Sequence, residues 1–152
     1  RLWEERDDRL AAELMPYHGL RSLDDAVRAL ELAMRCYEVR DTSDGRRALL
    51  LHRRAWLARD AAHDDETEWL RRARSAYVRA YEHDTSLSEE AAARLAYLVG
   101  DLAYRLDDLA GSAQWLETAV RVAPNTSSGI ARTARDRLQD VRDQIKRIRM
   151  AS

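Results

Sequence analysis

The sequence predicts an all-α fold in which antiparallel helical hairpins form a right-handed stack. Of the 152 residues, 45% are apolar, whereas only five are glycine and two are proline. Residues that break helices are therefore scarce, and Ala, Leu and Arg, which favour helices, are abundant. Apolar residues recur at helical spacing, and no segment shows the sustained alternation typical of a strand. This length fits one domain, which we expect to span residues 1–152.

Seven helices are predicted, and the first three form the N-terminal part of the chain. Residues 2–15 end before Pro16, and residues 22–40 begin at Ser22, whose hydroxyl can cap the helix. A polar loop over residues 41–45 leads to the third helix, about residues 46–62. Because every connection is short, neighbouring helices are expected to pair antiparallel.

The last four predicted helices are residues 66–82, 88–106, 109–122 and 129–150. Ser88 is followed by two glutamates, which the helix macrodipole favours in a first turn. Asp107 and Asp108 make a tight turn, Pro124 ends the sixth helix, and residues 126–128 cap the last. We therefore divide the domain into an N-terminal helix and linker (1–21), helical hairpins (22–125) and a long C-terminal capping helix (126–152).

An internal repeat supports the hairpin arrangement. Residues 69–73, Trp-Leu-Arg-Arg-Ala, recur as Trp-Leu-Glu-Thr-Ala at residues 115–119, which is 46 positions later. Each copy lies on the second helix of a predicted hairpin. The first helix of each hairpin has a small residue at the expected contact, Ala55 in one case and Gly100 in the other.

The later copy resembles a tetratricopeptide repeat. The matching positions are Ala96, Val99, Gly100, Ala103, Ser112, Leu116, Ala119 and Pro124. Small residues at Gly100 and Ala119 let two helices approach closely, and Leu116 fills the gap between them. The copies are 46 residues apart rather than about 34, so an irregular stack is expected.

A closer resemblance covers about residues 22–142. The segments that carry it are Arg-Arg-Ala-Trp-Leu-Ala-Arg (53–59), Ala-x-x-x-Tyr-x-x-Ala-Tyr (73–81), Tyr-Leu-Val-Gly-Asp-Leu-Ala-Tyr-Arg-Leu (97–106) and Ala-Arg-Asp-Arg-Leu-Gln-Asp (134–140). They look like the helical part of a bacterial family called domain of unknown function 2225. Leu138 stands where the family usually has Trp. The resemblance implies a helical fold and no particular activity.

Members of that family often begin with a cysteine-rich segment of zinc-binding type. Cys36 is the only cysteine of this chain and cannot make such a site. Either the segment was cut away or this relative lacks it. We interpret Cys36, which lies on an apolar helical stripe, as a small buried residue rather than a reactive thiol.

No motif of the sequence favours catalysis, a metal or a cofactor. The 152 residues contain no Gly-rich phosphate loop, no His-Glu-x-x-His and no Gly-x-Ser-x-Gly, and the four histidines lack ligand spacing. We therefore expect a protein that is not an enzyme. A net charge of −1 makes a nucleic-acid partner unlikely. The absence of a long apolar run or a signal peptide predicts no membrane partner and a cytoplasmic location.

The first helix of each hairpin is expected to line a concave binding groove. The predicted groove residues are His52, Trp56, Arg59, Tyr97, Asp101, Tyr104, Arg105, Arg135 and Arg142. Aromatic rings beside arginines suit peptides, because the guanidinium binds carboxylates and the ring packs against apolar stems. Two alternatives stay open: Trp56 belongs to the core, and Arg59 and Arg105 pair with Asp60 and Asp101.

The leading functional hypothesis is a non-catalytic scaffold that binds a peptide or partner protein in this groove. The second is a nucleic-acid-associated or regulatory module, since residues 132–149 carry seven basic residues against three aspartates. The third is an accessory domain of a larger protein whose N-terminal zinc-binding segment is missing. A homodimer through the C-terminal helix is also open, because Ile145 and Ile148 extend its apolar stripe beyond the predicted stack.

Overall fold

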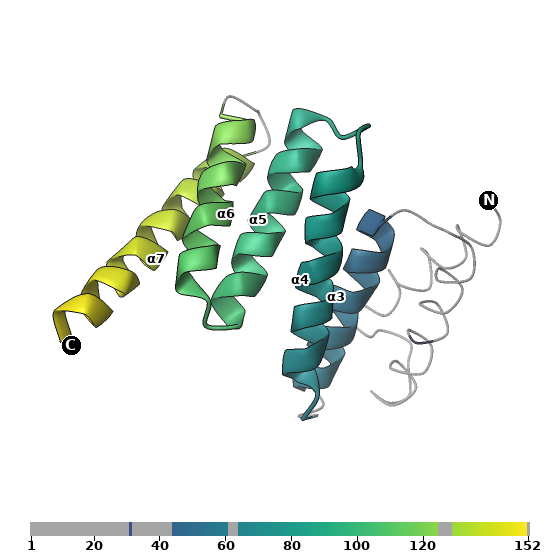
Figure 1. Ribbon diagram of the computed structural model, residues 1–152, viewed down its shortest axis with the longest axis horizontal. Helices are drawn as coiled ribbons and strands as arrows, with labels where there is room; N and C mark the ends of the chain where they lie inside the picture. Colours follow the sequence, from purple (N-terminus) through teal and green to yellow (C-terminus); the bar gives the residue numbers. More distant parts are fainter. Residues whose placement is uncertain (1–30, 32–43, 61–63, 125–128, 152) are drawn as a thin grey trace. The chain divides into compact units, whose positions relative to one another are not determined.

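The chain is helical wherever its structure is described. The computed structural model describes residues 31, 44–60, 64–124 and 129–151 (Figure 1). Its helices are α3 (Asp44–Asp60), α4 (Glu66–His83), α5 (Glu89–Arg105), α6 (Leu109–Val122) and α7 (Ile130–Ala151). These ranges contain no strand, which confirms the all-α prediction for them. The predicted helices 2–15 and 22–40 lie outside the described residues except for Glu31, as do Cys36 and the predicted cap at residues 126–128.

Two compact units make up the chain, Arg1–Ala76 and Tyr77–Ser152, and α4 contributes residues to both. In the first unit, apolar faces of α3 and of the start of α4 are buried. The buried apolar residues described there are Ala48, Leu50, Leu51, Ala55, Leu57, Ala58, Leu70, Ala73 and Ala76. Ala55, the small residue expected at a helix contact, is fully buried.

A buried arginine links α3 to the start of α4. Only 4% of Arg54 is exposed. Its Nε lies 3.6 Å from Glu31 Oε1, and its Nη2 donates to Asp65 Oδ2 at 3.3 Å. Its guanidinium lies 4.6 Å from the centre of the Trp69 ring, whose Nε1 donates to the same Asp65 oxygen at 2.8 Å. The two ion pairs offset part of the cost of burying this charge, whereas Arg54 Nε and Nη1 make no hydrogen bond to the described residues.

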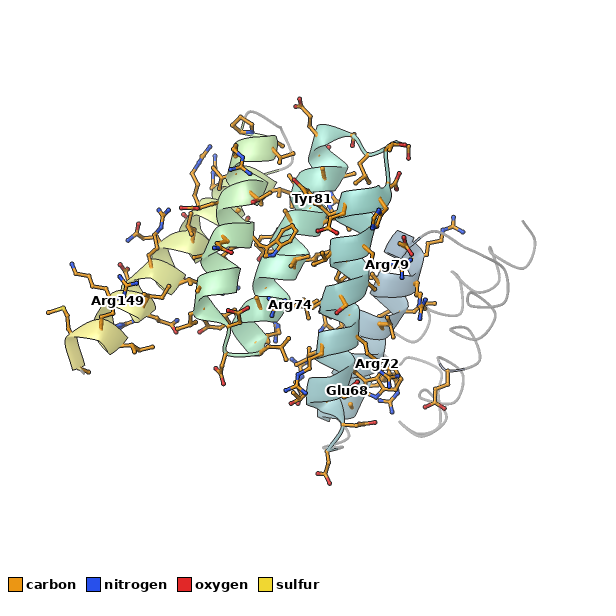
Figure 2. The ribbon with its side chains drawn as sticks, viewed as in Figure 1. Glu68, Arg72, Arg74, Arg79, Tyr81 and Arg149 are labelled. Atoms are coloured by element: carbon orange, nitrogen blue, oxygen red, sulfur yellow. The ribbon has the colours of Figure 1, made fainter. Side chains whose placement is uncertain are left out.

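Helix α4 carries charges that suit its dipole. Glu66 and Glu68 lie in its first turn and His83 in its last. Figure 2 shows Glu68 and Arg72 close together at the start of the helix, and Arg72 Nε lies 3.1 Å from Glu68 Oε1. Both side chains are exposed, so this pair adds only a few tenths of a kcal/mol.

Residues 84–88 form the turn between α4 and α5, as predicted. Asp84 Oδ1 accepts hydrogen bonds from the hydroxyl of Ser86 at 2.6 Å and from its amide at 3.0 Å. The hydrogen bonds from the Ser86 hydroxyl and amide stabilise the ionised carboxylate and lower the pKa of Asp84 from its usual range. Ser88 then caps α5, because its Oγ accepts from the amide of Ala91 at 3.1 Å.

The turn between α5 and α6 spans residues 106–108. Asp107 has a φ of 61°, a left-handed conformation that Asp tolerates better than most residues. Asp108 caps α6, because its Oδ1 accepts from the amide of Gly111 at 2.9 Å. A Cβ on residue 111 would lie 2.2 Å from Asp108 Oδ2, so the carboxylate would have to shift to make room for a side chain there. The prediction that the two aspartates form a turn and a cap is confirmed.

Helices α5 and α6 approach closely at Gly100. A Cβ on this residue would lie 2.9 Å from Leu116 Cγ and 3.4 Å from the Leu116 amide nitrogen. Beside this contact, the hydroxyl of the fully buried Ser112 donates to the Gly100 carbonyl at 2.7 Å. Ala119 is also fully buried. The predicted contact of Gly100 with Leu116 is therefore confirmed.

Helix α7 completes the core of the second unit. Figure 1 shows α5, α6 and α7 side by side, with α6 antiparallel to both of the others. One buried cluster joins the three helices through Ala96, Leu116, Ala119, Ala134, Leu138 and Val141. Tyr81, labelled on α4 in Figure 2, packs against this cluster, and its ring meets that of Trp115 edge-on at 5.3 Å.

Substitution of Gly100 tests the close contact. We expect Gly100→Ala to lower the free energy of unfolding by about 1–3 kcal/mol through overpacking, although Ala favours helices. Leu116→Ala alone should cost about 2–5 kcal/mol. The double variant should lose less than the sum, because a shortened residue 116 leaves room for the new methyl group.

Urea unfolding followed by circular dichroism measures these free energies. Gly45→Ala is the control, since a Cβ on Gly45 meets nothing within 4 Å, and it should not destabilise the protein. Fully additive losses in the double variant, or an unchanged stability of Gly100→Ala, would contradict the contact.

Candidate binding pocket

A cavity of about 330 Å³ opens on the second unit between α5 and α7. Helix α6 forms its base, and all three helices contribute side chains to its lining. The cavity is therefore a product of the same three-helix packing that forms the core. Its size is within the range of ordinary ligand pockets, which span about 300–1,000 Å³.

Helix α5 lines the cavity with two aromatic rings and one carboxylate. Tyr97, Asp101 and Tyr104 contribute to the lining and are spaced by four and three residues, which places them on one helical face. Tyr97 is half-buried, whereas Tyr104 is 39% exposed. Asp101 Oδ2 accepts from Arg105 Nε at 2.9 Å, so this wall holds one carboxylate with its charge partly balanced.

The base of the cavity is small and apolar. Gly100, Ser112 and Leu116 line it, and Val141 adds an apolar group from α7. Leu116 fills the space that a side chain on Gly100 would need, so this part of the lining is closely packed. The hydroxyl of Ser112 is directed to the Gly100 carbonyl and thus stabilises the hairpin.

Helix α7 supplies most of the charge. Arg137, Asp140, Gln144 and Arg147 line the cavity and form one stripe along the helix, with spacings of three and four residues. Gln144 Nε2 donates to the Tyr104 hydroxyl at 2.9 Å, so one hydrogen bond joins the two walls.

Three of these charges are available to a ligand. Among the described residues, none provides a hydrogen bond or an ion pair to the side chains of Arg137, Asp140 or Arg147, and all three are exposed. Asp143, by contrast, accepts from Gln139 Nε2 at 2.9 Å on its own helix. The cavity therefore presents charges of both signs beside two aromatic rings.

The structure brings together three of the residues predicted for the groove, Tyr97, Asp101 and Tyr104. Arg105 forms an ion pair with Asp101, which is the alternative to ligand binding that the sequence left open for this residue. Arg135 and Arg142 do not line this cavity. Arg135 Nη2 donates to the Pro124 carbonyl at 3.4 Å, and Arg142 Nη2 pairs with Glu117 of α6.

The predicted groove residues of α3 lie in the first unit. His52 is only 4% exposed, and its ring centre lies 4.8 Å from that of the half-buried Trp56 in an edge-on arrangement. Arg59 is exposed. Their participation in a groove stays a prediction, and the side chain of Asp60, the proposed partner of Arg59, lies outside the described residues.

The α7 residues of the pocket were not predicted, because the rotation of this helix depends on its packing against other helices. One signal was present, however. The buried stripe Ala134, Leu138 and Val141 marks the inward face of α7. Arg137 follows Ala134 by three residues and Gln144 follows Val141 by three. Both therefore lie at the border of the buried stripe, and both line the pocket.

The chain belongs to a bacterial protein family. A family model described as "Uncharacterized protein conserved in bacteria (DUF2225)" matches residues 2–145, which is nearly the whole chain. The resemblance inferred from the sequence segments is thereby confirmed. No curated protein and no solved structure matches the chain.

None of the described helices is both long enough and apolar enough to cross a membrane. No group of three or more His, Cys, Asp or Glu side chains in the described ranges is arranged to hold a metal ion. The pocket between α5 and α7 is thus the candidate site that the described part of the chain offers.

A double-mutant cycle tests the hydrogen bond between the pocket walls. Tyr104→Phe and Gln144→Ala each remove one partner, and we expect a coupling of about 0.5–1 kcal/mol in the free energy of unfolding. The cycle of Tyr104→Phe with Gln139→Ala is the control and should be additive, because Gln139 bonds to Asp143. Equal coupling energies in the two cycles would show that no hydrogen bond between Tyr104 and Gln144 joins the walls.

Proposed function

We propose that this protein is a non-catalytic binding module that holds a peptide segment of a partner protein between α5 and α7. The observation that carries the proposal is the cavity itself, in which Arg137, Asp140 and Arg147 have no partner among the described residues. Charged groups at a folded surface that are already positioned beside aromatic rings favour recognition of a charged, partly apolar ligand.

The composition of the lining supports a peptide rather than a small metabolite. The rings of Tyr97 and Tyr104 offer broad faces with a polar edge, which is typical of binding surfaces for proteins. Arginine is enriched at such surfaces because its planar fork binds carboxylates through two hydrogen bonds. The cavity is also open along the helices rather than closed around one compact molecule, since its lining on α7 extends from Arg137 to Arg147.

The chemistry of the lining favours binding over catalysis. A hydrolytic site would need a nucleophile within hydrogen-bond reach of a base. The hydroxyl of Ser112 instead donates to a backbone carbonyl, and Tyr104 accepts from Gln144. We therefore propose that the protein is not an enzyme.

We also propose that the α5–α6 hairpin is one unit of a right-handed, tetratricopeptide-like stack, with α7 as the capping helix. The contact of Gly100 with Leu116 and the burial of Ala119 support this, because they reproduce the roles of the small and large residues in such a hairpin. In such stacks the first helices of the hairpins face the ligand, and α5 would be one of them.

The basic C-terminal helix motivates the other hypotheses. Its excess of arginine could attract nucleic acid, but Asp136, Asp140 and Asp143 are interspersed among the basic residues and would repel phosphates. Ile148 is 58% exposed and Met150 is 78% exposed at its end, as a homodimer through this helix would require. Dimerisation stays a prediction.

Selection from a random peptide library displayed on phage tests the proposed function. The wild-type protein should enrich peptides with a shared pattern. Arg147→Ala and Asp140→Ala should each weaken binding of the enriched peptides by about tenfold, because each removes a ligand contact worth about 1.4 kcal/mol. Fluorescence anisotropy with synthetic copies of those peptides measures the affinities.

Matched controls lie on the same helix. Arg149→Ala and Asp136→Ala change the same charges at exposed positions outside the cavity lining, and both should bind as the wild type does. Failure to enrich any peptide, or equal losses in the pocket and control variants, would overturn the proposal. Strong, salt-sensitive retention of DNA or RNA with no peptide binding would favour the nucleic-acid hypothesis instead.

A further inference from the structure

We infer that the pocket reads the order of charges along an extended peptide, namely an acidic residue, then a basic residue, then a second acidic residue. The inference rests on the proposed function, since it names the class of ligand that the same cavity takes. It follows from the positions of the charged side chains along α5 and α7, the two helices that form the walls of the cavity.

One hydrogen bond sets the register between the walls. Helices α5 and α7 run in the same direction, because α6 is antiparallel to both (Figure 1). Gln144 donates to Tyr104, so these two residues lie at the same level. Tyr97 precedes Tyr104 by seven residues and Arg137 precedes Gln144 by seven, which is about 10.5 Å in each helix. Tyr97 and Arg137 therefore both lie toward the same end of the cavity.

The carboxylates lie between these two levels. Asp101 precedes Tyr104 by three residues and Asp140 precedes Gln144 by four, so they face the middle of the cavity from opposite walls. Arg147 follows Gln144 by three residues and lies at the other end. Asp143 also lines the cavity, one residue before Gln144, so the order along α7 is positive at Arg137, negative at Asp140 and Asp143, and positive at Arg147.

The middle of the cavity suits a cationic side chain. Asp140 has no ion-pair partner among the described residues, and Asp101 is shared with Arg105. The rings of Tyr97 and Tyr104 lie on either side of this level along α5. A lysine or arginine side chain placed there gains a carboxylate and an aromatic face together.

The spacing sets the length of the matching peptide. Arg137 and Arg147 are ten residues apart, or about 15 Å along the helix. An extended peptide rises about 3.3 Å per residue, so its two acidic residues would be about five positions apart. Asp140 is about 4.5 Å from the level of Arg137, which places the basic residue one or two positions after the first acid.

Synthetic peptides of defined charge order test the inference. The probes are three fluorescein-labelled, end-blocked peptides in a Gly-Ser frame. The first contains Glu-Ala-Lys-Ala-Ala-Glu, the second contains the inverted order Lys-Ala-Glu-Ala-Ala-Lys, and the third has the composition of the first with its charges adjacent, Lys-Glu-Glu-Ala-Ala-Ala. We expect the first to bind at least about tenfold more tightly than either of the others at low salt, because charge complementarity sets specificity.

A protein variant with reversed charges provides a second test of the charge order. The variant Arg137→Glu/Arg147→Glu should prefer the inverted peptide, because its ends are now acidic. Arg132→Glu/Arg149→Glu carries the same change in net charge on the same helix outside the cavity and should keep the wild-type preference. A lost fold cannot produce a reversed preference, so this result separates recognition from stability.

The outcomes distinguish the inference from the function on which it rests. Equal affinities for the three peptides, or the same preference in both double variants, would overturn the charge order. If the library still yields peptides whose binding depends on Arg147, the proposed function stands while the charge order falls. If no probe and no library peptide binds, both fall together.

Discussion

The close contact between Gly100 and Leu116 is the constraint on which the second unit depends. A glycine at this position lets the backbone of α5 meet the side chain of Leu116, and the Ser112 hydroxyl adds a buried hydrogen bond beside it. The cap at Asp108 sets where α6 starts and thereby brings Leu116 opposite Gly100. Local capping and long-range packing therefore specify the same register, as expected of a sequence with one stable fold.

The buried side chains of α7 increase in size along the helix, which forms one wall of the cavity. Ala131 and Ala134 are buried near the start of α7, whereas the larger Leu138 and Val141 are buried further along. Figure 1 shows α7 inclined to α6. Polar residues of α5 and α7 line the cavity between the two helices, and Leu116 of α6 fills the space beside Gly100.

The hairpin could be predicted from sequence because its determinants are local. The serine and aspartate caps, the glycine and the spacing of apolar residues all lie within a few turns of the contact that they produce. The rotation of α7 could not be predicted in the same way, since it depends on Leu138 and Val141 packing against another helix. Arg135 and Arg142 were therefore assigned to the groove, although they contact Pro124 and a residue of α6, while Arg137 and Arg147 line the cavity.

Nuclear magnetic resonance of the intact chain tests the basis of this account most directly. We expect strong nuclear Overhauser effects between the Gly100 α-protons and the Leu116 methyl groups, together with slow exchange of the buried Gly100 amide. Absence of these effects, with an amide that exchanges as fast as those of exposed residues, would contradict the account.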